Sequence, residues 1–558
     1  MAQDTNQNRP ADVAQADSVG GMAKRLLNPA HLSDLARRSA ATLKEQGAEQ
    51  LWRDVTSRVG LAFHHDSWQH RADLPLRREL KAQRAEYADG KPGPVVSVVV
   101  PLYNTPEKFF GQMLASVQKQ TYPHWQLVLV DASDAAHAAF STHASKAAAK
   151  EVENGGIAAN TTAGFVLATG TYIALLDHDD VLYPNALYES VKTLQSQGAE
   201  LVYSDEIVLS ADLKQLGGYH FKPDFAPDYL RGVNFITHLA VFSRALLDRA
   251  GAYESSEYDG AQDHDLMLRL TEQTTRDKIA HIKKVLYIWR GHAGSTAAGM
   301  EAKPYALAAG VRAIDAQLQR LNLPGKAMAV PDAPGAFQVR YELTGPPLVS
   351  VMIPNKDHID DLDRCLKSLY ANAGYDNFEV LVIENNSEQQ ETFAYYKTMP
   401  ERYPNSRVVT YVGPFNFSAV NNLGARFAKG EHLLLLNNDI EVLSHDFLRE
   451  LLSYSQRPDV GAVGAKLYYP DDTIQHAGVI MGINGSAGHS HKSYPRKAVG
   501  DLYRLVTTQD YMAVTGACLM TKTELYRAAG GLDEAKFAVA YNDVDYCLKL
   551  WQKGLLNV

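Results

Sequence analysis

The chain of 558 residues contains only three cysteines, and this scarcity excludes several classes of protein. Cys365, Cys518 and Cys547 are too few for a disulfide framework, and their spacing matches no zinc-binding pattern. A few unpaired thiols are typical of proteins kept in a reducing compartment. The cysteines therefore predict a cytoplasmic protein without structural disulfides or a thiolate metal centre.

The chain also lacks an excess of positive charge and long apolar runs. Its formal net charge is −9, whereas general binding to nucleic acid needs a basic surface. Residues 1–20 are polar and predict a disordered tail, not a signal peptide. No apolar run approaches the roughly 18 residues that cross a bilayer. Nucleic acid is therefore not expected as a partner, and any membrane contact is expected to be peripheral.

What the chain contains instead is a long repeat. An apolar segment ending in proline, residues 95–101, recurs as residues 348–354. A segment ending in an acid, residues 127–131, recurs as residues 380–384. Both pairs share one offset, because 354 − 101 and 384 − 131 are each 253. A long-period repeat of this kind predicts two copies of one domain.

Two later segments repeat in the same order with a drifting offset. Residues 172–180 recur as 433–439, and residues 262–265 recur as 542–545. The offsets grow to 260 (437 − 177) and 280 (543 − 263). Preserved order with changing spacing indicates that the two copies differ in their loops.

Short Val- and Leu-rich runs alternate with helical patterns, such as residues 107–120 and 184–197. This alternation predicts an α/β fold with a Rossmann-like, mixed and mainly parallel sheet. We predict a first domain over residues 91–296, a helical linker over 297–345 and a second domain over 346–558.

A helical region with several arginines is predicted over residues 21–90, ahead of the first domain. A basic helical face lies on an anionic membrane or covers another protein surface, or it is a solvated face, which is the commoner case.

Acidic residues follow the predicted strands. Asp131 ends one strand, and Asp177, Asp179 and Asp180 follow another. Ligands of open α/β sheets bind beyond the carboxyl ends of the strands, and residues two apart project to the same side. Clustered carboxylates repel one another unless a cation lies among them. The pattern predicts a site for Mg²⁺ or Mn²⁺, with an Asp-rich surface turn as the alternative.

Taken together, these segments resemble the family 2 glycosyltransferases, which have the GT-A fold. The resemblance rests on residues 96–104 (VSVVVPLYN), 120–131 (QTYPHWQLVLVD), 168–180 (ATGTYIALLDHDD), 262–270 (QDHDLMLRL) and 287–292 (YIWRGH). Two such domains in one chain, with residues 221–224 (FKPD) in the first, are similar to bacterial enzymes that build O-antigen or capsule polysaccharides.

The resemblance implies that the first copy binds a nucleotide-sugar. Pro101 and Asp131 would lie at the nucleotide. Asp177 and Asp179 match the DXD motif, which binds the ribose and the metal-bridged diphosphate. His292 lies on an arm expected to close over the diphosphate, so Asp179 and His292 are the predicted metal ligands.

The resemblance also implies a catalytic base. Asp263 matches the acid that takes the acceptor proton in inverting members of the family. Asp265 is the alternative, although it could instead cap a helix or pair with Arg269.

The second copy departs from this pattern at one point. The matching residues are Pro354 and Glu384 at the nucleotide, Asn437 and Asp439 at the diphosphate, and Asp543 as base. Only one carboxylate remains in the DXD position, so the metal is expected to rely on Asp439 and Glu441. Family members usually continue into a histidine arm, so either this domain is C-terminally incomplete or the arm comes from elsewhere.

Histidines in the second copy have a less specific pattern. His489 and His491 are expected to be exposed loop residues rather than a metal pair, because no third ligand is placed by spacing. His476 either shapes the acceptor side or is a buried structural histidine.

The resemblance implies a bifunctional, inverting, metal-dependent transferase that moves sugars from UDP-, dTDP- or GDP-sugars to a glycan or lipid-linked glycan. It is expected in the cytoplasm, with peripheral contact at the inner face of the cell membrane or with other polysaccharide-assembly proteins. One alternative is a single active first domain with the second as scaffold or acceptor-binding module. Another is a non-catalytic sugar-nucleotide-binding component.

Overall fold

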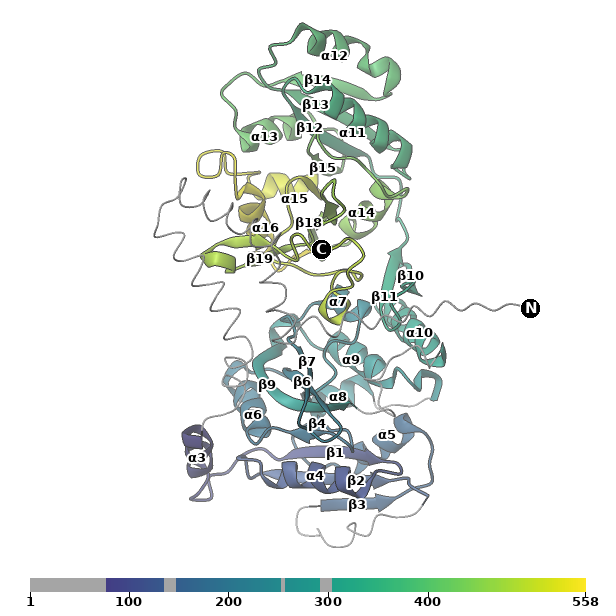
Figure 1. Cartoon of the computed structure of the whole chain (residues 1–558), viewed down its shortest axis with the longest axis vertical. Coiled ribbons are helices and arrows are strands. Elements are labelled where there is room, and N and C mark those ends of the chain that lie inside the picture. The colour runs from purple at the N-terminus through teal and green to yellow at the C-terminus, as the bar shows by residue number, and fades with distance from the viewer. Residues whose placement is uncertain (1–76, 135–146, 252–255, 292–303) are drawn as a thin grey trace, which may run out of the picture. The chain divides into compact units, whose positions relative to one another are not determined.

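The computed structural model describes residues 77–134, 147–251, 256–291 and 304–558 (Figure 1). The predicted tail, residues 1–20, lies outside the described residues. So do His292 and most of the predicted helical region 21–90, of which helix α3 (Arg77–Glu86) is described. None of the helices in the described part of the chain combines the length and apolar composition that a membrane span needs.

The first copy alternates strands and helices as the sequence predicts. Its strands are β1 (Val96–Leu102), β2 (Trp125–Asp131), β3 (Ala147–Glu151), β4 (Tyr172–Leu175), β5 (Val181–Leu182), β6 (Leu201–Ser210), β7 (Leu216–His220), β8 (Ala240–Ser243) and β9 (Ile279–Gly291). Its helices are α4 (Glu107–Gln118), α5 (Ile157–Leu167), α6 (Ala186–Gln197), α7 (Pro227–Gly232), α8 (Arg244–Ala250) and α9 (Gln262–Glu272).

The second copy follows the same plan. Its strands are β12 (Val349–Asn355), β13 (Phe378–Glu384), β14 (Ser406–Thr410), β15 (His432–Leu436), β16 (Val460–Gly464), β17 (Leu467–Tyr468), β18 (Ile474–His476), β19 (Val479–Met481), β20 (Ala487–His489), β21 (Cys518–Lys522) and β22 (Leu556–Asn557). Its helices are α11 (Ile359–Asn372), α12 (Gln390–Arg402), α13 (Phe417–Phe427), α14 (Phe447–Ser455), α15 (Thr523–Ala528) and α16 (Asn542–Gln552).

The strand orders of the two sheets correspond position by position, except that the first sheet has one further strand, β5, at its end. The first sheet runs β3-β2-β1-β4-β8-β6-β9-β5, and the second runs β14-β13-β12-β15-β21-β16-β22. In both, one strand (β8 or β21) is antiparallel to its two neighbours, and the strands before it are parallel. The predicted fold class, a mixed and mainly parallel α/β sheet occurring twice, is therefore confirmed.

Both faces of each sheet are buried, which explains the continuous apolar runs. Along β1, Val98 and Val100 pack with α4 and α6, while Val99 packs on the opposite face with α5. Along β12, Val351 and Met352 likewise face opposite sides, with α11 and α14 on one and α13 and α16 on the other. Alternating side chains of a strand must point to opposite faces, so helices cover each sheet on both sides.

The turn before the third parallel strand is the same in both copies at the atomic level. The backbone N–H of Gly170 donates to Ser97 Oγ (2.9 Å), and that of Gly430 donates to Ser350 Oγ (2.8 Å). A Cβ on Gly430 would lie 2.6 Å from both the carbonyl oxygen of Leu348 and the backbone nitrogen of Ser350. Only glycine allows the chain to approach the neighbouring strand this closely.

We expect Gly430→Ala to lower the free energy of unfolding by about 1–3 kcal/mol, because backbone atoms must shift to admit the methyl group. Gly111→Ala is the matched control, since a Cβ at Gly111 meets no atom within 4 Å and lies in helix α4. Urea unfolding followed by circular dichroism compares the two. Equal midpoints for both variants would contradict the steric argument.

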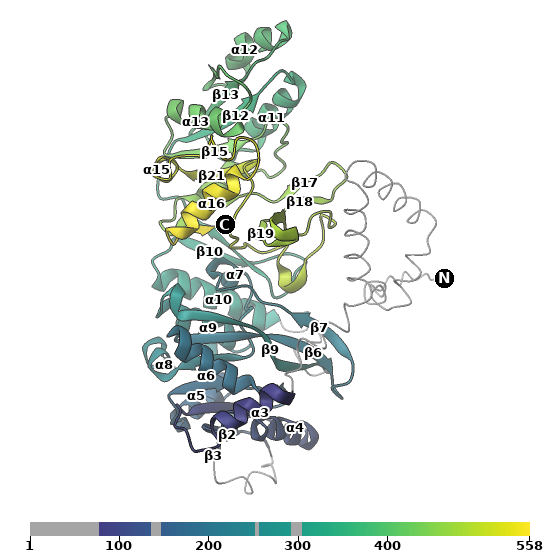
Figure 2. The same ribbon diagram turned by 90° about the vertical axis from the view of Figure 1, so that its left-hand side faces the viewer.

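Helix α10 (Pro304–Arg320) and a two-stranded hairpin, β10 (Gly325–Ala329) with β11 (Phe337–Tyr341), occupy the described part of segment 297–345. Ile314, Leu318 and Val339 belong to one buried cluster that also includes Leu268 of the first copy and Leu366 of the second. The hydrophobic core is therefore continuous through this segment. Helix α10 and strand β10 of the segment are labelled in the view turned by 90° (Figure 2).

Candidate active site

The acids identified from the sequence lie at the carboxyl ends of parallel strands. Asp131 ends β2, is buried, and accepts a hydrogen bond at Oδ1 from the backbone N–H of Ser133 (3.0 Å). Pro101 lies in β1 opposite Val130 of β2. Asp177 follows β4, on the other side of β1. The sheet order therefore places these residues at one edge, on both sides of the central strand β1.

Three side chains near this edge are close enough to share a cation. Ligand atoms of Asp177, Asp180 and His238 all lie within 4.8 Å of one another. Asp179 is partly exposed and belongs to the same turn, but it is not part of this group of three. The geometry therefore brings together Asp177 and Asp180, with a histidine from the segment before β8.

His238 lies between two carboxylates. Its Nε2 is 3.3 Å from Asp177 Oδ2, and its Nδ1 is 3.3 Å from Glu206 Oε2 on strand β6. Burial would lower the pKa of His238, but these two acids raise it well above its usual value. The two carboxylates therefore favour the charged form of this imidazole, whose Nε2 could act as a ligand only after losing its proton.

Glu206 is the anchor of this arrangement. Its carboxylate is buried and accepts from Lys222 Nζ (3.1 Å) and contacts His220 Nδ1 (2.7 Å). Burial would raise its pKa, but Lys222 and the two histidines hold it well below its usual value. Lys222 also donates to the carbonyl oxygen of Ile236 (2.9 Å) and to that of His238, so the FKPD segment fixes the loop that carries His238.

Residues of strand β9 form hydrogen bonds with the acidic turn that contains Asp179 and Asp180. Asp180 accepts from Tyr287 Oη (2.7 Å) and from the backbone N–H of Arg290 (2.7 Å), while Arg290 Nε donates to the carbonyl oxygen of Asp179. Burial raises the pKa of Asp180 well above its usual value, and the charges of Asp177 and Asp179 add to this. A cation bound close to Asp180 would favour its ionised form, because an opposite charge lowers the pKa of a carboxyl group.

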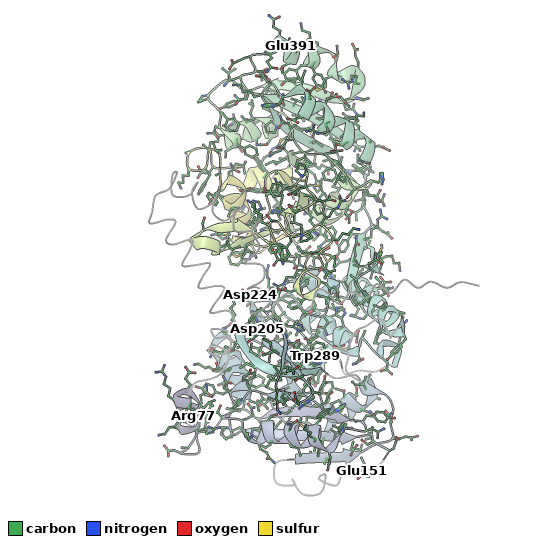
Figure 3. The ribbon with its side chains drawn as sticks, in the orientation of Figure 1. Arg77, Glu151, Asp205, Asp224, Trp289 and Glu391 are labelled. Atoms are coloured by element: carbon green, nitrogen blue, oxygen red, sulfur yellow. The ribbon has the colours of Figure 1, made fainter. Side chains whose placement is uncertain are left out.

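Asp205, next to Glu206 on β6, and Asp224 of the FKPD segment are linked through one histidine. Figure 3 labels two of the residues concerned, Asp205 and Asp224. Asp205 Oδ1 contacts His281 Nε2 (2.8 Å), and His281 Nδ1 lies 3.5 Å from Asp224. These contacts fasten the FKPD segment to strand β9, so they support the site without facing it.

Asp263 is linked to the acidic turn by one short segment. Asn234 Nδ2 donates to Asp263 Oδ2 (3.1 Å), and His238, four residues later, contacts Asp177. Four residues span about 14 Å at most. The proposed base and the acidic turn are therefore both in contact with the segment that precedes β8.

Asp265 has a different environment from Asp263. It is buried and pairs through Oδ2 with Arg269 Nε (2.9 Å), which itself donates to the carbonyl oxygens of Ala250 and Gly251. Asp263 is partly exposed in the first turn of α9. These contacts give Asp265 a structural role and leave Asp263 as the carboxylate open to a ligand.

The second copy uses backbone groups where the first uses side chains. Asp543, in the first turn of α16, accepts at Oδ2 from the backbone N–H of Gly516 (2.8 Å). The next residue, Ala517, accepts at its carbonyl oxygen from the N–H of Asn437 (3.0 Å). The segment before β21 thus connects the proposed base to the end of β15, as the segment before β8 does in the first copy.

The remaining predicted residues of the second copy are less enclosed. Asp439 and Glu441 are exposed, and neither belongs to a three-ligand group among the described residues. Pro354 lies in β12. Glu384 ends β13, is buried, and accepts from Tyr396 Oη (2.7 Å) and Ser387 Oγ (2.6 Å).

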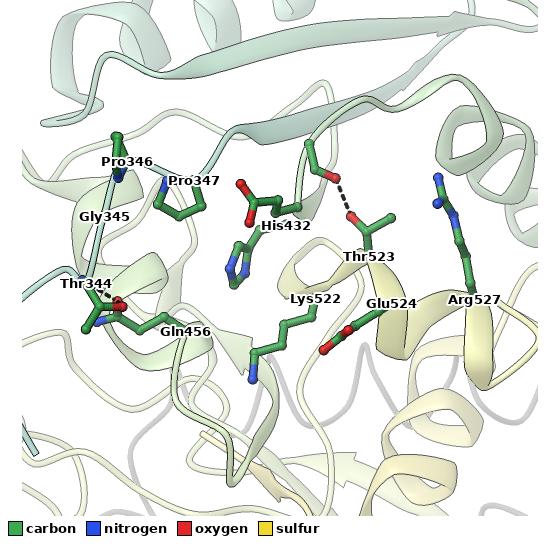
Figure 4. Close-up of a pocket in the computed structure, with 12 residues that line it drawn as sticks. Thr344, Gly345, Pro346, Pro347, His432, Gln456, Lys522, Thr523, Glu524 and Arg527 are labelled. Carbon is green, nitrogen blue, oxygen red and sulfur yellow. Dashed lines mark hydrogen bonds between the residues drawn. The ribbon is translucent and has the colours of Figure 1, made fainter. Parts of the chain in front are cut away.

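A cavity of about 690 Å³ lies elsewhere in the second copy (Figure 4). It is lined by Pro347, His432 and Lys522, which stand at the start of β12, the start of β15 and the end of the antiparallel strand β21. This is the edge opposite to the one that carries Asn437 and Asp439. This cavity is therefore separate from the acids.

The sequence of both copies matches the model of one protein family, glycosyl transferase family 2, over residues 97–250 and 350–521. The chain belongs to glycosyl transferase family 2. Its GT-A fold class, predicted above, is in agreement with the two sheets.

Two relatives of this family 2 protein are longer than the chain itself. It is 40% identical over 476 residues to "Uncharacterized protein y4gI" of Sinorhizobium fredii, an alignment that covers 84% of the chain and 52% of the relative. It is 38% identical over 475 residues to "O-antigen biosynthesis protein RfbC" of Myxococcus xanthus, covering 83% of the chain and 36% of the relative. The chain therefore spans about half and about a third of these two proteins.

Among solved structures, TarS of S. aureus matches with a TM-score of 0.33 and 17% identity. The match covers 40% of this chain and 39% of TarS.

Proposed function

We propose that this family 2 protein is an inverting glycosyltransferase that moves sugars from nucleotide-sugar donors to a growing bacterial cell-surface glycan, with one site in each copy. The observation that carries the proposal is the shared architecture: in each copy one segment before the antiparallel strand contacts both the polar turn and the proposed base, through Asn234 and His238 or through Gly516 and Ala517. The relative named for O-antigen biosynthesis supports the class of product.

In the first copy, Pro101 and Asp131 would receive the nucleotide, and Asp177 and Asp179 the ribose and diphosphate. The predicted metal ligands are Asp179 and His292, and the Asp177–Asp180–His238 group offers two carboxylates and an imidazole, a donor set that suits Mn²⁺ or Mg²⁺. Such a cation would neutralise the charge of the departing diphosphate.

Asp263 would act on the acceptor. The hydroxyl oxygen of the acceptor forms a bond to the anomeric carbon while the bond from that carbon to the diphosphate oxygen breaks. The hydroxyl proton passes to Asp263, and the bonding electrons leave with the nucleoside diphosphate. Attack opposite to the leaving group inverts the anomeric configuration, so no covalent intermediate with the protein is required.

The second copy would use Pro354 and Glu384 at the nucleotide, Asn437 and Asp439 at the diphosphate, and Asp543 as the base, with Asp439 and Glu441 at the metal. The exposure of Asp439 and Glu441 favours weaker metal binding there. The second candidate is a single active first copy, with the second as scaffold or acceptor-binding module. The exposure of Asp439 and Glu441 favours this alternative too.

The acceptor would be a glycan or a lipid-linked glycan, and the donor a UDP-, dTDP- or GDP-sugar. A lipid-linked acceptor would place the protein at the inner face of the cell membrane, beside other polysaccharide-assembly proteins.

Separate alanine variants of Asp179 and Asp439 test the two-site proposal. Nucleoside diphosphate release and the bonds formed are measured with a panel of sugar nucleotides and Mn²⁺, before and after EDTA. We expect each variant to lose a different product bond and EDTA to abolish both. Loss of every bond in the Asp179 variant alone, with none lost in the Asp439 variant, would favour one active copy. Full sugar transfer after replacing Asp179 and Asp263 together would instead contradict the catalytic assignment of the first copy. Binding of a sugar nucleotide without transfer by the unaltered chain would indicate a protein that binds without transferring.

A further inference from the structure

Two histidines of the second copy form a directly bonded pair next to the proposed base. His476, at the end of β18, and His489, at the end of β20, face each other with 2.8 Å between their Nδ1 atoms. The rings meet edge to face, with centroids 5.0 Å apart. His476 is buried, with 1% of its surface exposed, whereas His489 is exposed. The pair therefore runs from the interior to the surface.

The backbone fixes the protonation of the inner ring. His476 Nε2 accepts hydrogen bonds from the backbone N–H groups of Gly478 (3.3 Å) and Thr515 (3.4 Å). A backbone N–H group can only donate, so it could not accept from a protonated Nε2. Nε2 must therefore be unprotonated. Burial also lowers the pKa of His476 to about 3, so the ring is neutral and carries its proton on Nδ1.

The outer ring is fixed by the inner one. Because His476 Nδ1–H donates to His489 Nδ1, that nitrogen of His489 carries no proton. Burial lowers the pKa of His489 as well, so its ring is neutral at physiological pH and must be protonated on Nε2. The chain of bonds thus presents one N–H group, from His489 Nε2, at the exposed end of the pair.

Consecutive peptide groups tie this pair to Asp543. The N–H of Thr515 donates to His476 Nε2, and the N–H of the next residue, Gly516, donates to Asp543 Oδ2 (2.8 Å). The charge of Asp543 also acts on His489. A base must contact the acceptor hydroxyl that it deprotonates, so a donor close to Asp543 is placed to reach the acceptor rather than the nucleotide.

We propose that His489 binds the acceptor sugar of the second copy by donating Nε2–H to one of its oxygens, and that His476 is the positioning residue that fixes this tautomer. The proposal rests on the function proposed above for Asp543. The proposal gives the second copy a histidine that donates a hydrogen bond to the acceptor sugar. In the first copy the side chain bonded to the proposed base is an asparagine, Asn234, which donates to Asp263.

The test uses the full chain with Asp263→Asn, so that nucleoside diphosphate release reports the second copy. Donors are UDP-, dTDP- and GDP-sugars, and the acceptor probes are a panel of octyl glycosides. His489→Asn keeps an acceptor near the position of Nδ1 but removes the donor at Nε2, whereas His489→Gln places an amide N–H near Nε2. We expect the acceptor KM to rise at least about tenfold in His489→Asn and to recover in His489→Gln, with the donor KM unaffected in both.

Three comparisons separate the possible outcomes. His476→Asn can still donate from the position of Nδ1 and is expected to keep the acceptor KM, whereas His476→Gln is expected to raise it; a merely structural histidine would not show this difference. His491→Asn, on the same hairpin, is the control and should leave the acceptor KM unchanged. If Asp543→Asn is inactive but His489→Asn and His489→Gln have equal acceptor KM values, the proposed role of His489 is wrong. Activity retained by Asp543→Asn, or no release with any donor–acceptor pair, would overturn the proposed function of the second copy as well.

Discussion

Replacing Asp263 by asparagine is expected to reduce sugar transfer by the first copy about 10²–10⁴-fold, the usual contribution of a general base. Asparagine has nearly the same shape as aspartate, and its amide oxygen can still accept from Asn234 Nδ2. What it cannot do is take the proton of the acceptor hydroxyl. The measurement is the rate of product-bond formation at saturating donor, in a chain whose second copy carries Asp543→Asn.

Two companion variants make this result specific. Asp248→Asn removes an exposed carboxylate from helix α8 and should leave the rate unchanged. Asp265→Asn weakens the buried pair with Arg269 and should lower the thermal midpoint more than Asp263→Asn does. If Asp263→Asn retained more than a tenth of the wild-type rate, Asp263 could not be the base.

The largest effect on stability is expected at Asp228, in helix α7. Its buried carboxylate lies 3.0 Å from Arg231 Nη1 and 2.6 Å from Nη1 of Arg457, a residue of the second copy. Asp228→Ala would leave two buried guanidinium groups without this partner. Breaking a buried pair in this way costs about 3–5 kcal/mol.

Urea unfolding measures this loss, and Glu388→Ala serves as the control. Glu388 pairs with Lys356 at 3.3 Å, but both side chains are largely exposed, so the loss should be below about 1 kcal/mol. Similar losses for the two variants would mean that Asp228 and Arg457 do not form a buried pair in solution.

The same pair predicts a pH dependence with a definite sign. Burial opposes ionisation of Asp228, but Arg457 and Arg231 lower its pKa to about 2. In the unfolded chain the pKa of aspartate is about 3.9. The contribution of Asp228 is therefore complete above about pH 4 and is lost as the pH falls toward 2. The difference in stability between wild type and Asp228→Ala should shrink over that interval.

The sequence predicts the fold well because the strands are continuous apolar runs that end in acids. Two copies with shared order could be recognised from the repeated segments, such as residues 95–101 and 348–354, and the strand orders of the two sheets agree with this repeat. The alternation of burial along β1 and β12 follows directly from those runs. The pattern of apolar residues along the chain is therefore enough to predict those parts of the fold that depend on buried strands.

The site could be predicted only in part, because several of its contacts come from distant strands. His238 follows Phe235, Ile236 and Thr237, and in the sequence it looks like an isolated histidine beside a core strand. It reaches Asp177 only because β8 pairs with β4. The one available signal is a histidine immediately before a short apolar strand, together with the Asp205-Glu206 pair inside β6.

In the second copy, part of the site consists of backbone groups. Gly516 N–H and the Ala517 carbonyl contact Asp543 and Asn437, and every residue type offers such groups. The bond between His476 and His489 depends on the pairing of β19 with β20 and of Val479 with Ala513, which spacing alone does not reveal.

The core that continues through α10, β10 and β11 determines how the two copies can be studied. Residues such as Ile314, Leu318 and Val339 share one apolar interior with both sheets, and Asp228 is paired with Arg457 across it. Cutting the polypeptide between α10 and β11 would expose part of this apolar interior to water on each fragment, so halves expressed separately are expected to aggregate. Denaturation of the intact protein should accordingly follow a single sigmoidal curve, and assigning bonds to either catalytic centre calls for point substitutions in the undivided chain.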